Sequence, residues 1–214
     1  MKSARQILLE RFDYSSTQIP LPREQAQVVT AWGKLNVPVD ALAPDSWETE
    51  PHVTALYGLE ENTVSEEMRK IIEGSAPIVI RLDKATVFHQ PDQDVVVVRV
   101  NSPGLRLLYW QLASKLKHHS QWSSYQPHTT VAYCVKDRVD SLEGAQVFAP
   151  DTPSVFTADF IDFCPAVGDR VRLQFKGKII KESEEPFESL GFPTDCSQLA
   201  RYRIARRAKR LLGS

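Results

Sequence analysis

The chain has 214 residues, enough for one large domain or two small lobes. Hydrophobic residues make up 42% and charged residues 25%, which is ordinary globular usage and excludes disordered, collagen-like and disulfide-stapled miniprotein classes. No apolar run approaches the roughly 18 residues that span a bilayer, and the first residues lack the long apolar stretch of a signal peptide. We therefore expect a cytoplasmic protein with no transmembrane segment.

The net charge of −1 hides an uneven distribution along the chain. Residues 197–214 hold six basic residues and no acidic one, so residues 1–196 hold 20 basic against 27 acidic residues. Such an acidic body is a poor general binder of nucleic acid, and we expect it to handle phosphate only in a local pocket. The three cysteines, Cys134, Cys164 and Cys196, are odd in number and lack CxxC spacing, so we expect free thiols and no metal site.

Helical and alternating apolar patterns follow one another in the first half of the chain. The elements expected there are a helix over 23–35, a loop over 45–51 that leads into a strand from His52, a helix over 64–73, and strands over 77–88 and 94–100. The strands are assigned from β-branched runs and the second helix from its amphipathic spacing.

The second half opens with a helix start, because Ser102 can cap free N–H groups and Pro103 suits the first helical position. The elements expected after it are a helix that ends near His118 and His119, a strand over 123–135, strands over 154–163 and 170–178, an acidic connector over 181–195 and a basic amphipathic helix over 197–212. This order divides the chain into a domain over 1–180 and a C-terminal part over 181–214.

Two heptapeptides match each other, PHVTALY over 51–57 and PHTTVAY over 127–133. Side chains on a strand alternate, so the His and Thr of each repeat share one face, and Tyr57 and Tyr133 are expected on the other. Helix, strand, strand and helix separate the repeats. We therefore predict an α+β fold of two pseudo-symmetric α/β lobes, with antiparallel sheets around a central cleft and a basic C-terminal helix.

The paired His-x-Thr strands predict a site for phosphoryl transfer built from His52, Thr54, His128 and Thr130. One neutral imidazole can take a proton from the nucleophile while a protonated one gives a proton to the leaving oxygen. The two hydroxyls can hold nonbridging phosphate oxygens, and the arrangement needs neither metal nor cofactor. The alternative is a pair of structural histidines.

On these motifs the sequence resembles the two-histidine (2H) phosphoesterase superfamily, which includes 2′-5′ RNA ligase-like proteins, cyclic nucleotide phosphodiesterases and RNA end-processing enzymes. With the segment YSSTQIPLP over 14–22 it looks most like phage anti-CBASS phosphodiesterases. The resemblance implies metal-independent cleavage of 3′-5′ bonds in cyclic oligonucleotides such as cGAMP, evasion of CBASS immunity and a place in the host cytoplasm. It makes His52, Thr54, His128 and Thr130 catalytic, and leaves open which histidine is the base.

Four further residues are candidate substrate contacts. Tyr14 is a candidate to stack on a nucleobase, or else belongs to an ordinary packed strand. Trp122 and Tyr125 precede the second repeat and are candidates to border the cleft. Asp162 is a candidate acceptor for a base amine, or else belongs to a solvated strand face.

The expected partner is a cyclic di- or trinucleotide, without stable binding of duplex nucleic acid by the body. The basic C-terminal helix is expected to contact nucleic acid, anionic lipid or an acidic partner such as another copy, or to be a solvated tail. Two other functions stay open. One is RNA end processing, as a 2′,3′-cyclic phosphodiesterase or a 2′-5′ RNA ligase, and the other is a nucleotide-binding module without turnover.

Overall fold

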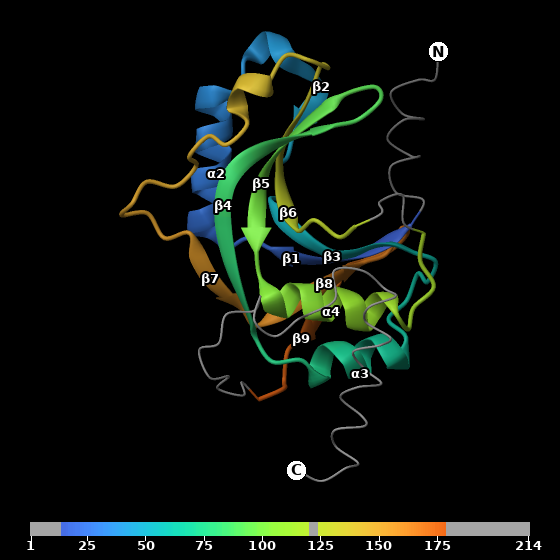
Figure 1. Cartoon of the computed structure of the whole chain (residues 1–214). Coiled ribbons are helices and arrows are strands. Elements are labelled where there is room, and N and C mark those ends of the chain that lie inside the picture. Colours follow the sequence, from blue (N-terminus) through green and yellow to red (C-terminus); the bar gives the residue numbers. More distant parts are fainter. Residues whose placement is uncertain (1–13, 120–123, 179–214) are drawn as a thin grey trace, which may run out of the picture. The chain divides into compact units, whose positions relative to one another are not determined.

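The structure, a computed structural model, describes residues 14–119 and 124–178, which hold three α-helices and one nine-stranded sheet (Figure 1). The helical elements are α2 (Arg23–Asn36), α3 (Glu66–Gly74) and α4 (Pro103–Ala113), with short 3-10 turns η1 (Val39–Ala41) and η2 (Asp140–Leu142). The strands are β1 (Ser15–Pro20), β2 (Leu42–Trp47), β3 (His52–Leu59), β4 (Ile78–His89), β5 (Asp94–Asn101), β6 (His128–Cys134), β7 (Val155–Ala158), β8 (Phe160–Cys164) and β9 (Val171–Gln174).

The sheet is antiparallel, in the order β7-β4-β5-β6-β3-β1-β8-β9, with β2 paired to β6 beside this path. Asp159 alone separates β7 from β8 in the sequence, yet the two strands lie towards opposite ends of that order. The sheet therefore curls until its ends approach one another. This confirms the predicted α+β class. It also corrects the single strand expected over 154–163, which breaks at Asp159 so that each half can pair at its own end of the sheet.

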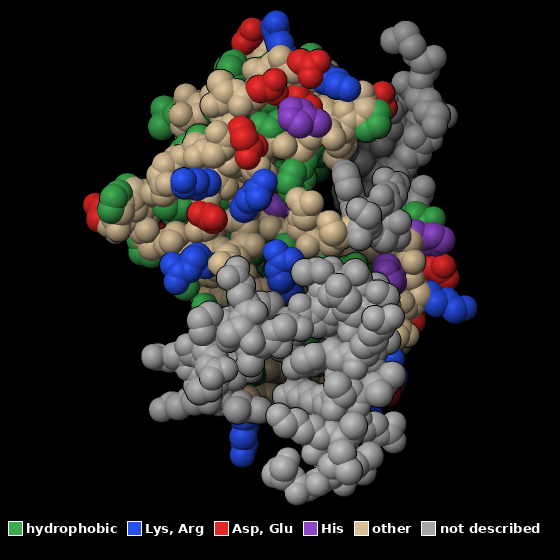
Figure 2. Space-filling model, viewed as in Figure 1, with side chains coloured by type: hydrophobic (Ala, Val, Ile, Leu, Met, Phe, Trp, Pro, Cys, Tyr) green, Lys and Arg blue, Asp and Glu red, His purple; other side chains and the backbone are tan. Residues whose placement is uncertain are grey.

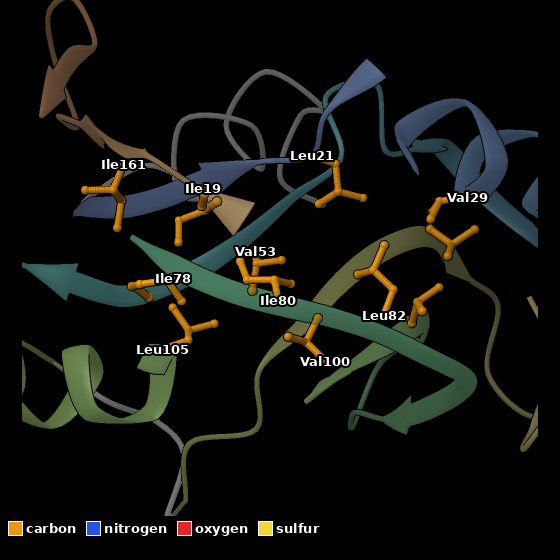
Figure 3. Close-up of a cluster of buried hydrophobic side chains, with 14 of the residues drawn as sticks. Ile19, Leu21, Val29, Val53, Ile78, Ile80, Leu82, Val100, Leu105 and Ile161 are labelled. Carbon is orange, nitrogen blue, oxygen red and sulfur yellow. The ribbon is translucent and has the colours of Figure 1, made fainter. Parts of the chain in front are cut away.

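The helices pack on one face of the sheet and enclose a single apolar core. In Figure 3, Val29 of α2 and Leu105 of α4 meet strand side chains such as Val53, Ile80 and Val100. Helix α3 adds Met68 and Ile72, which are fully buried. The opposite face of the sheet carries polar side chains together with Val95 and Val97, which are buried but lie outside that core.

The helices over 23–35 and 64–73 are confirmed within two residues at each end, and Ser102 caps α4 by accepting from the Leu105 N–H at 3.2 Å. Helix α4 ends at Ala113, however, so the expectation that His118 and His119 occupy its last turn is wrong. The chain turns there because its backbone goes on to pair with β3: His118 bridges to Leu59, and the His119 N–H donates to the Gly58 carbonyl at 2.8 Å.

The segment expected as a loop over 45–51 differs as well. Its first residues belong to β2, which pairs Leu42 with Cys134 and Trp47 with Ala132 on β6. Pro44 and Asp45 are poor strand formers by local propensity, so the sequence pattern does not indicate this strand, which depends on a long-range pairing with β6.

Gly58 tests the close approach between β3 and the segment after α4. It has φ +83°, and an added Cβ would collide with the His119 carbonyl oxygen. We expect Gly58→Ala to lower the free energy of unfolding by clearly more than the roughly 1–2 kcal/mol cost of a left-handed non-glycine residue. Gly144→Ala is the matched control in urea denaturation, since Gly144 has φ +75° and open space around it. Equal losses in the two variants would contradict the close packing.

Candidate active site

The two His-x-Thr repeats lie on neighbouring strands. β3 and β6 pair where Val53 is opposite Thr129, and both of these residues are fully buried on the core side. Antiparallel register then sets His52 against Thr130 and Thr54 against His128 on the other face. The two histidines are diagonal neighbours, a relation that spans about 7–8 Å between backbones. The four predicted residues thus form one cluster around a local two-fold.

Each histidine ring is held in the same way by the backbone. Nδ1 of His52 lies 2.8 Å from the Glu50 carbonyl oxygen, and Nδ1 of His128 lies 2.7 Å from that of Gln126. A carbonyl only accepts hydrogen bonds, so Nδ1 carries the proton and donates it in both rings. Nε2 is then the basic nitrogen of each neutral imidazole, and the atom that gains a proton when the ring is charged.

The environment of His128 favours its neutral form. Burial lowers the pKa of the His128 imidazole, and the nearby charge of His52 lowers that pKa further, against the opposing effect of the Gln126 carbonyl. The Phe88 ring stands edge-on to the imidazole at 4.9 Å between centroids. A neutral ring with a free lone pair on Nε2 is suited to accept a proton.

A β-bulge in each repeat turns its tyrosine onto the histidine face. Thr54 pairs with Gln18 and Tyr57 with Ser16, so three steps along β3 match two along β1. Ala55 and Leu56, between them, both point into the core. The prediction that Tyr57 faces away from the histidines is therefore wrong, because it assumed unbroken alternation.

The second repeat has the same irregularity. Thr130 pairs with Val97 and Tyr133 with Val95, while Val131 and Ala132 are both buried. Tyr133 thus also shares the histidine face, and its predicted orientation is wrong for the same reason. Two adjacent apolar residues between Thr and Tyr, present in both repeats, are the sequence signal that would have indicated a bulge.

The residues paired with the cluster on neighbouring strands continue it as a polar row across the sheet. Arg99 pairs with His128, Gln18 with both Thr54 and Asp162, and Asp162 with Arg172. The row, from β5 to β9, consists of Arg99, His128, Thr54, Gln18, Asp162 and Arg172. Each terminal guanidinium already has partners: Arg99 donates to the Thr86 hydroxyl at 3.1 Å, and Arg172 binds both oxygens of Asp162 at 2.9 and 3.2 Å.

Two adjoining hollows meet at Gln18 of this row and lie on either side of it, one towards His52 and one towards Tyr57. One, of about 290 Å³, is lined by His52, Gln18 and Asp162, and the other, of about 200 Å³, by Tyr14, Tyr57 and Gln18. Arg170 lines both hollows and pairs with the Glu50 carboxylate. The site is therefore a cluster of two His-Thr pairs with a polar recess beside it.

Comparison with known proteins identifies the family. A sequence model of the 2′-5′ RNA ligase superfamily matches residues 21–165. The chain belongs to this superfamily. The family expected from the motifs is thus confirmed, and membership supports phosphodiester chemistry on nucleotides in general terms.

The comparison with solved structures found similar folds at low sequence identity. A phosphoesterase crystal structure has a TM-score of 0.52 at 16% identity, covering 76% of this chain and 99% of that one. E. coli LigT, both in apo form and complexed with phosphate, has a TM-score of 0.49 at 18% identity, covering 76% of this chain and 98% of LigT. Comparison with curated proteins found no match. No helix of the described residues is long and apolar enough to cross a membrane.

Two of the predicted substrate contacts, Tyr14 and Asp162, line the recess described above. Tyr14 lines the outer hollow, and its ring meets that of His119 at 4.7 Å between centroids. Asp162 lines the inner hollow, although Arg172 already engages its carboxylate. Trp122 and the predicted helix over 197–212 lie outside the described residues.

Tyr125 is engaged with the scaffold of the site. Its hydroxyl donates to the Thr54 carbonyl at 2.8 Å, and its ring stacks on Tyr109 at 4.1 Å between centroids. Burial raises the pKa of the Tyr125 phenol far above its usual range. These contacts fix the backbone of β3 at Thr54, and contact between Tyr125 and substrate stays a prediction.

One group of side chains has spacing that suits a metal ion. Among the described residues, ligand atoms of His89, Asp94 and Asp140 lie within 4.8 Å of one another. The buried Asp94 carboxylate already accepts from His89 Nδ1 at 2.9 Å and from the Asp137 N–H at 2.7 Å. We therefore assign this group to ordering the turns around β5, not to the reaction.

Thr129 offers a test of the buried side of the site. Its hydroxyl is fully buried and lacks a hydrogen-bond partner among the described residues. We expect Thr129→Val to raise the free energy of unfolding by about 1 kcal/mol, since it removes an unsatisfied polar group at nearly constant shape. Thr17→Val is the matched control in urea denaturation and should destabilise, because Thr17 Oγ1 accepts from the Leu56 N–H at 3.0 Å. A loss of stability in both variants would contradict the assignment.

Proposed function

We propose that this superfamily member is a two-histidine phosphodiesterase that opens 3′-5′ bonds of cyclic oligonucleotide signals. The observation that carries the proposal is the cluster of His52, Thr54, His128 and Thr130 on one sheet face, with both Nδ1 atoms bound to carbonyls. Two imidazoles ordered in this way have the tautomer that general acid-base catalysis at Nε2 needs.

The reaction begins with attack of the ribose 2′-hydroxyl oxygen on phosphorus. Nε2 of neutral His128 accepts the hydroxyl proton, and Nε2 of protonated His52 donates a proton to the leaving 5′-oxygen. The new O–P bond replaces the broken one, which leaves a 2′,3′-cyclic phosphate and a 5′-hydroxyl. Thr54 and Thr130 donate hydrogen bonds to the nonbridging oxygens as charge develops on them.

The assignment of base and acid follows from the two environments. Burial and the neighbouring imidazole lower the pKa of His128, so its neutral form prevails near neutral pH. His52 lies beside the recess and supplies the proton. This order assigns His128 as the general base.

A small cyclic substrate fits the charge of the body better than a long polyanion does. On the face shown in Figure 2, Lys and Arg side chains are interspersed with Asp and Glu over the described residues. Extended nucleic acids bind through a continuous row of cations. The recess beside His52 suits a compact ligand, whose opening would end its signal and serve evasion of CBASS immunity.

RNA end processing is the second candidate function. The superfamily name itself favours it, because the matching family model is that of 2′-5′ RNA ligases. The same four side chains would then act on a 2′,3′-cyclic phosphate or a 2′-5′ linkage. A module that binds nucleotides without turnover is the outcome if neither reaction occurs.

The function is tested by incubating the protein in EDTA with a panel of substrates and separating the products by chromatography. The panel holds 3′,3′-cGAMP, 2′,3′-cGAMP, cyclic tri-AMP, RNA ends with a 2′,3′-cyclic phosphate, and 2′-5′ dinucleotides. We expect opening of cyclic oligonucleotides, and a loss of about 10²–10⁴-fold in rate for either His52→Ala or His128→Ala.

His118→Ala is the matched control for those two variants. Nδ1 of His118 also lies near a carbonyl two residues upstream, that of Leu116 at 3.1 Å, but His118 is outside the cluster. The control should keep the wild-type rate. Activity confined to RNA ends would favour the second candidate, and wild-type turnover in either catalytic variant would rule out the two-histidine mechanism.

The pH profile tests His128 as the base. The active form of His128 is neutral, and burial lowers its pKa, so activity should persist below the ordinary imidazole value of about 6.5 before it falls. We expect the acid limb of kcat/KM to have its midpoint below that value. A midpoint at or above that value in the wild-type protein would contradict the assignment of His128 as the general base.

A further inference from the structure

The recess along β1 and β3 has two parts with different linings. Both hollows share Gln18 and Arg170, so they adjoin, and together they run from His52 to Tyr14 and Tyr57. Each alone is smaller than the roughly 300–1,000 Å³ of typical small-molecule sites. The adjoining pair therefore suits one ligand that fills both, with one end at the catalytic cluster.

The outer hollow has the chemistry of a nucleobase site. Tyr57 is 46% exposed there although it lies within a strand, because the bulge turns its ring out of the core. Tyrosine rings stack on bases of any kind. The Gln18 carboxamide, whose Nε2 donates to Ser16 Oγ at 2.9 Å, adds a donor and an acceptor that can read a base edge.

The charges around the recess point to an uncharged group in the outer hollow and an anionic one at the junction. Arg172 is fixed, since it binds Asp162 through two hydrogen bonds and covers the Phe160 ring at 3.7 Å from its centroid. Arg170 pairs with Glu50 through an exposed contact, and both side chains remain more than half exposed. Arg170 is thus the cation that can turn towards a phosphate group.

We propose that this recess, which lies along β1 and β3 beside the catalytic cluster, is a nucleotide subsite next to the scissile phosphate. The base lies against Tyr57 in the outer hollow, the Gln18 amide contacts its edge, and Arg170 binds the phosphate at the junction. The ligand class, a nucleotide, rests on the proposed function. Tyr57 is therefore a specificity residue for the nucleotide that this recess binds.

Calorimetric titration of the full-length His128→Ala protein tests this subsite without turnover, because His128 is outside both hollows. The probes are adenosine 5′-monophosphate, guanosine 5′-monophosphate and inorganic phosphate. We expect the mononucleotides to bind more tightly than phosphate. Added Tyr57→Ala should weaken mononucleotide binding about tenfold, since base stacking contributes about 1–3 kcal/mol, and should leave phosphate binding unchanged. Tyr57→Phe should retain most of the affinity.

A second pair of variants tests the junction. Arg170 and Arg138 are both 55% exposed and both pair with a surface carboxylate, that of Glu50 and that of Asp40. Arg170→Ala should weaken binding of mononucleotides, and Arg138→Ala should not. Circular dichroism and thermal melting of each variant separate loss of contact from loss of fold.

The outcomes also separate the subsite from the proposed function. Mononucleotide binding that depends on Tyr57, in a protein that opens no member of the substrate panel, would support the subsite and reject the phosphodiesterase. Turnover of cyclic oligonucleotides with binding unaffected by Tyr57→Ala, or mononucleotides that bind no more tightly than phosphate, would overturn the subsite. Weakening by Tyr57→Phe equal to that by Tyr57→Ala would assign the effect to the hydroxyl and contradict stacking.

Discussion

The geometry of the candidate site depends on one antiparallel pairing, that of Val53 with Thr129. Both side chains are fully buried in the core. A slip of one residue between β3 and β6 would turn Val53 to the polar face and bury His52, so the core specifies the register strongly. The register that places the two histidines is thus set by burial on the far side of the sheet, and backbone hydrogen bonds at the site then orient the rings.

The sequence could predict this cluster because alternation along a strand is a local property. His and Thr at i and i+2 share a face in any regular strand, and the repeated heptapeptide indicated that two such pairs come together around a cleft. The direct pairing of the two strands is known only from the structure. The orientation of Tyr57 was predicted wrongly because a bulge depends on the partner strand. Ser16 and Gln18 are two residues apart on β1, whereas the residues paired with them on β3 are three apart. The predicted end of α4 was wrong for a similar reason, since the chain after Ala113 leaves the helix to pair with β3.

The two repeats are equivalent in sequence but not in surroundings. His128 lies against Phe88 and is buried enough for its pKa to fall, whereas His52 lines an open recess. Because the heptapeptides match at Pro, His, Thr and Tyr, no comparison between them can assign base and acid. In the proposed mechanism that assignment comes from the burial of His128, and the fold brings Phe88, which is distant in sequence, to this histidine.

The charges along the polar row bear on the proposed binding of phosphate by this protein. Arg99 lies near Glu143 at one end, and Arg172 binds Asp162 at the other, so the row presents oriented N–H and O–H donors with little net charge. A long polyanion gains little from such a surface, because its affinity depends on many uncompensated cations. A single phosphate gains directional hydrogen bonds there, which do not require a positive field. The row therefore favours ligands whose phosphate groups can be placed individually, which is the property expected of a compact nucleotide.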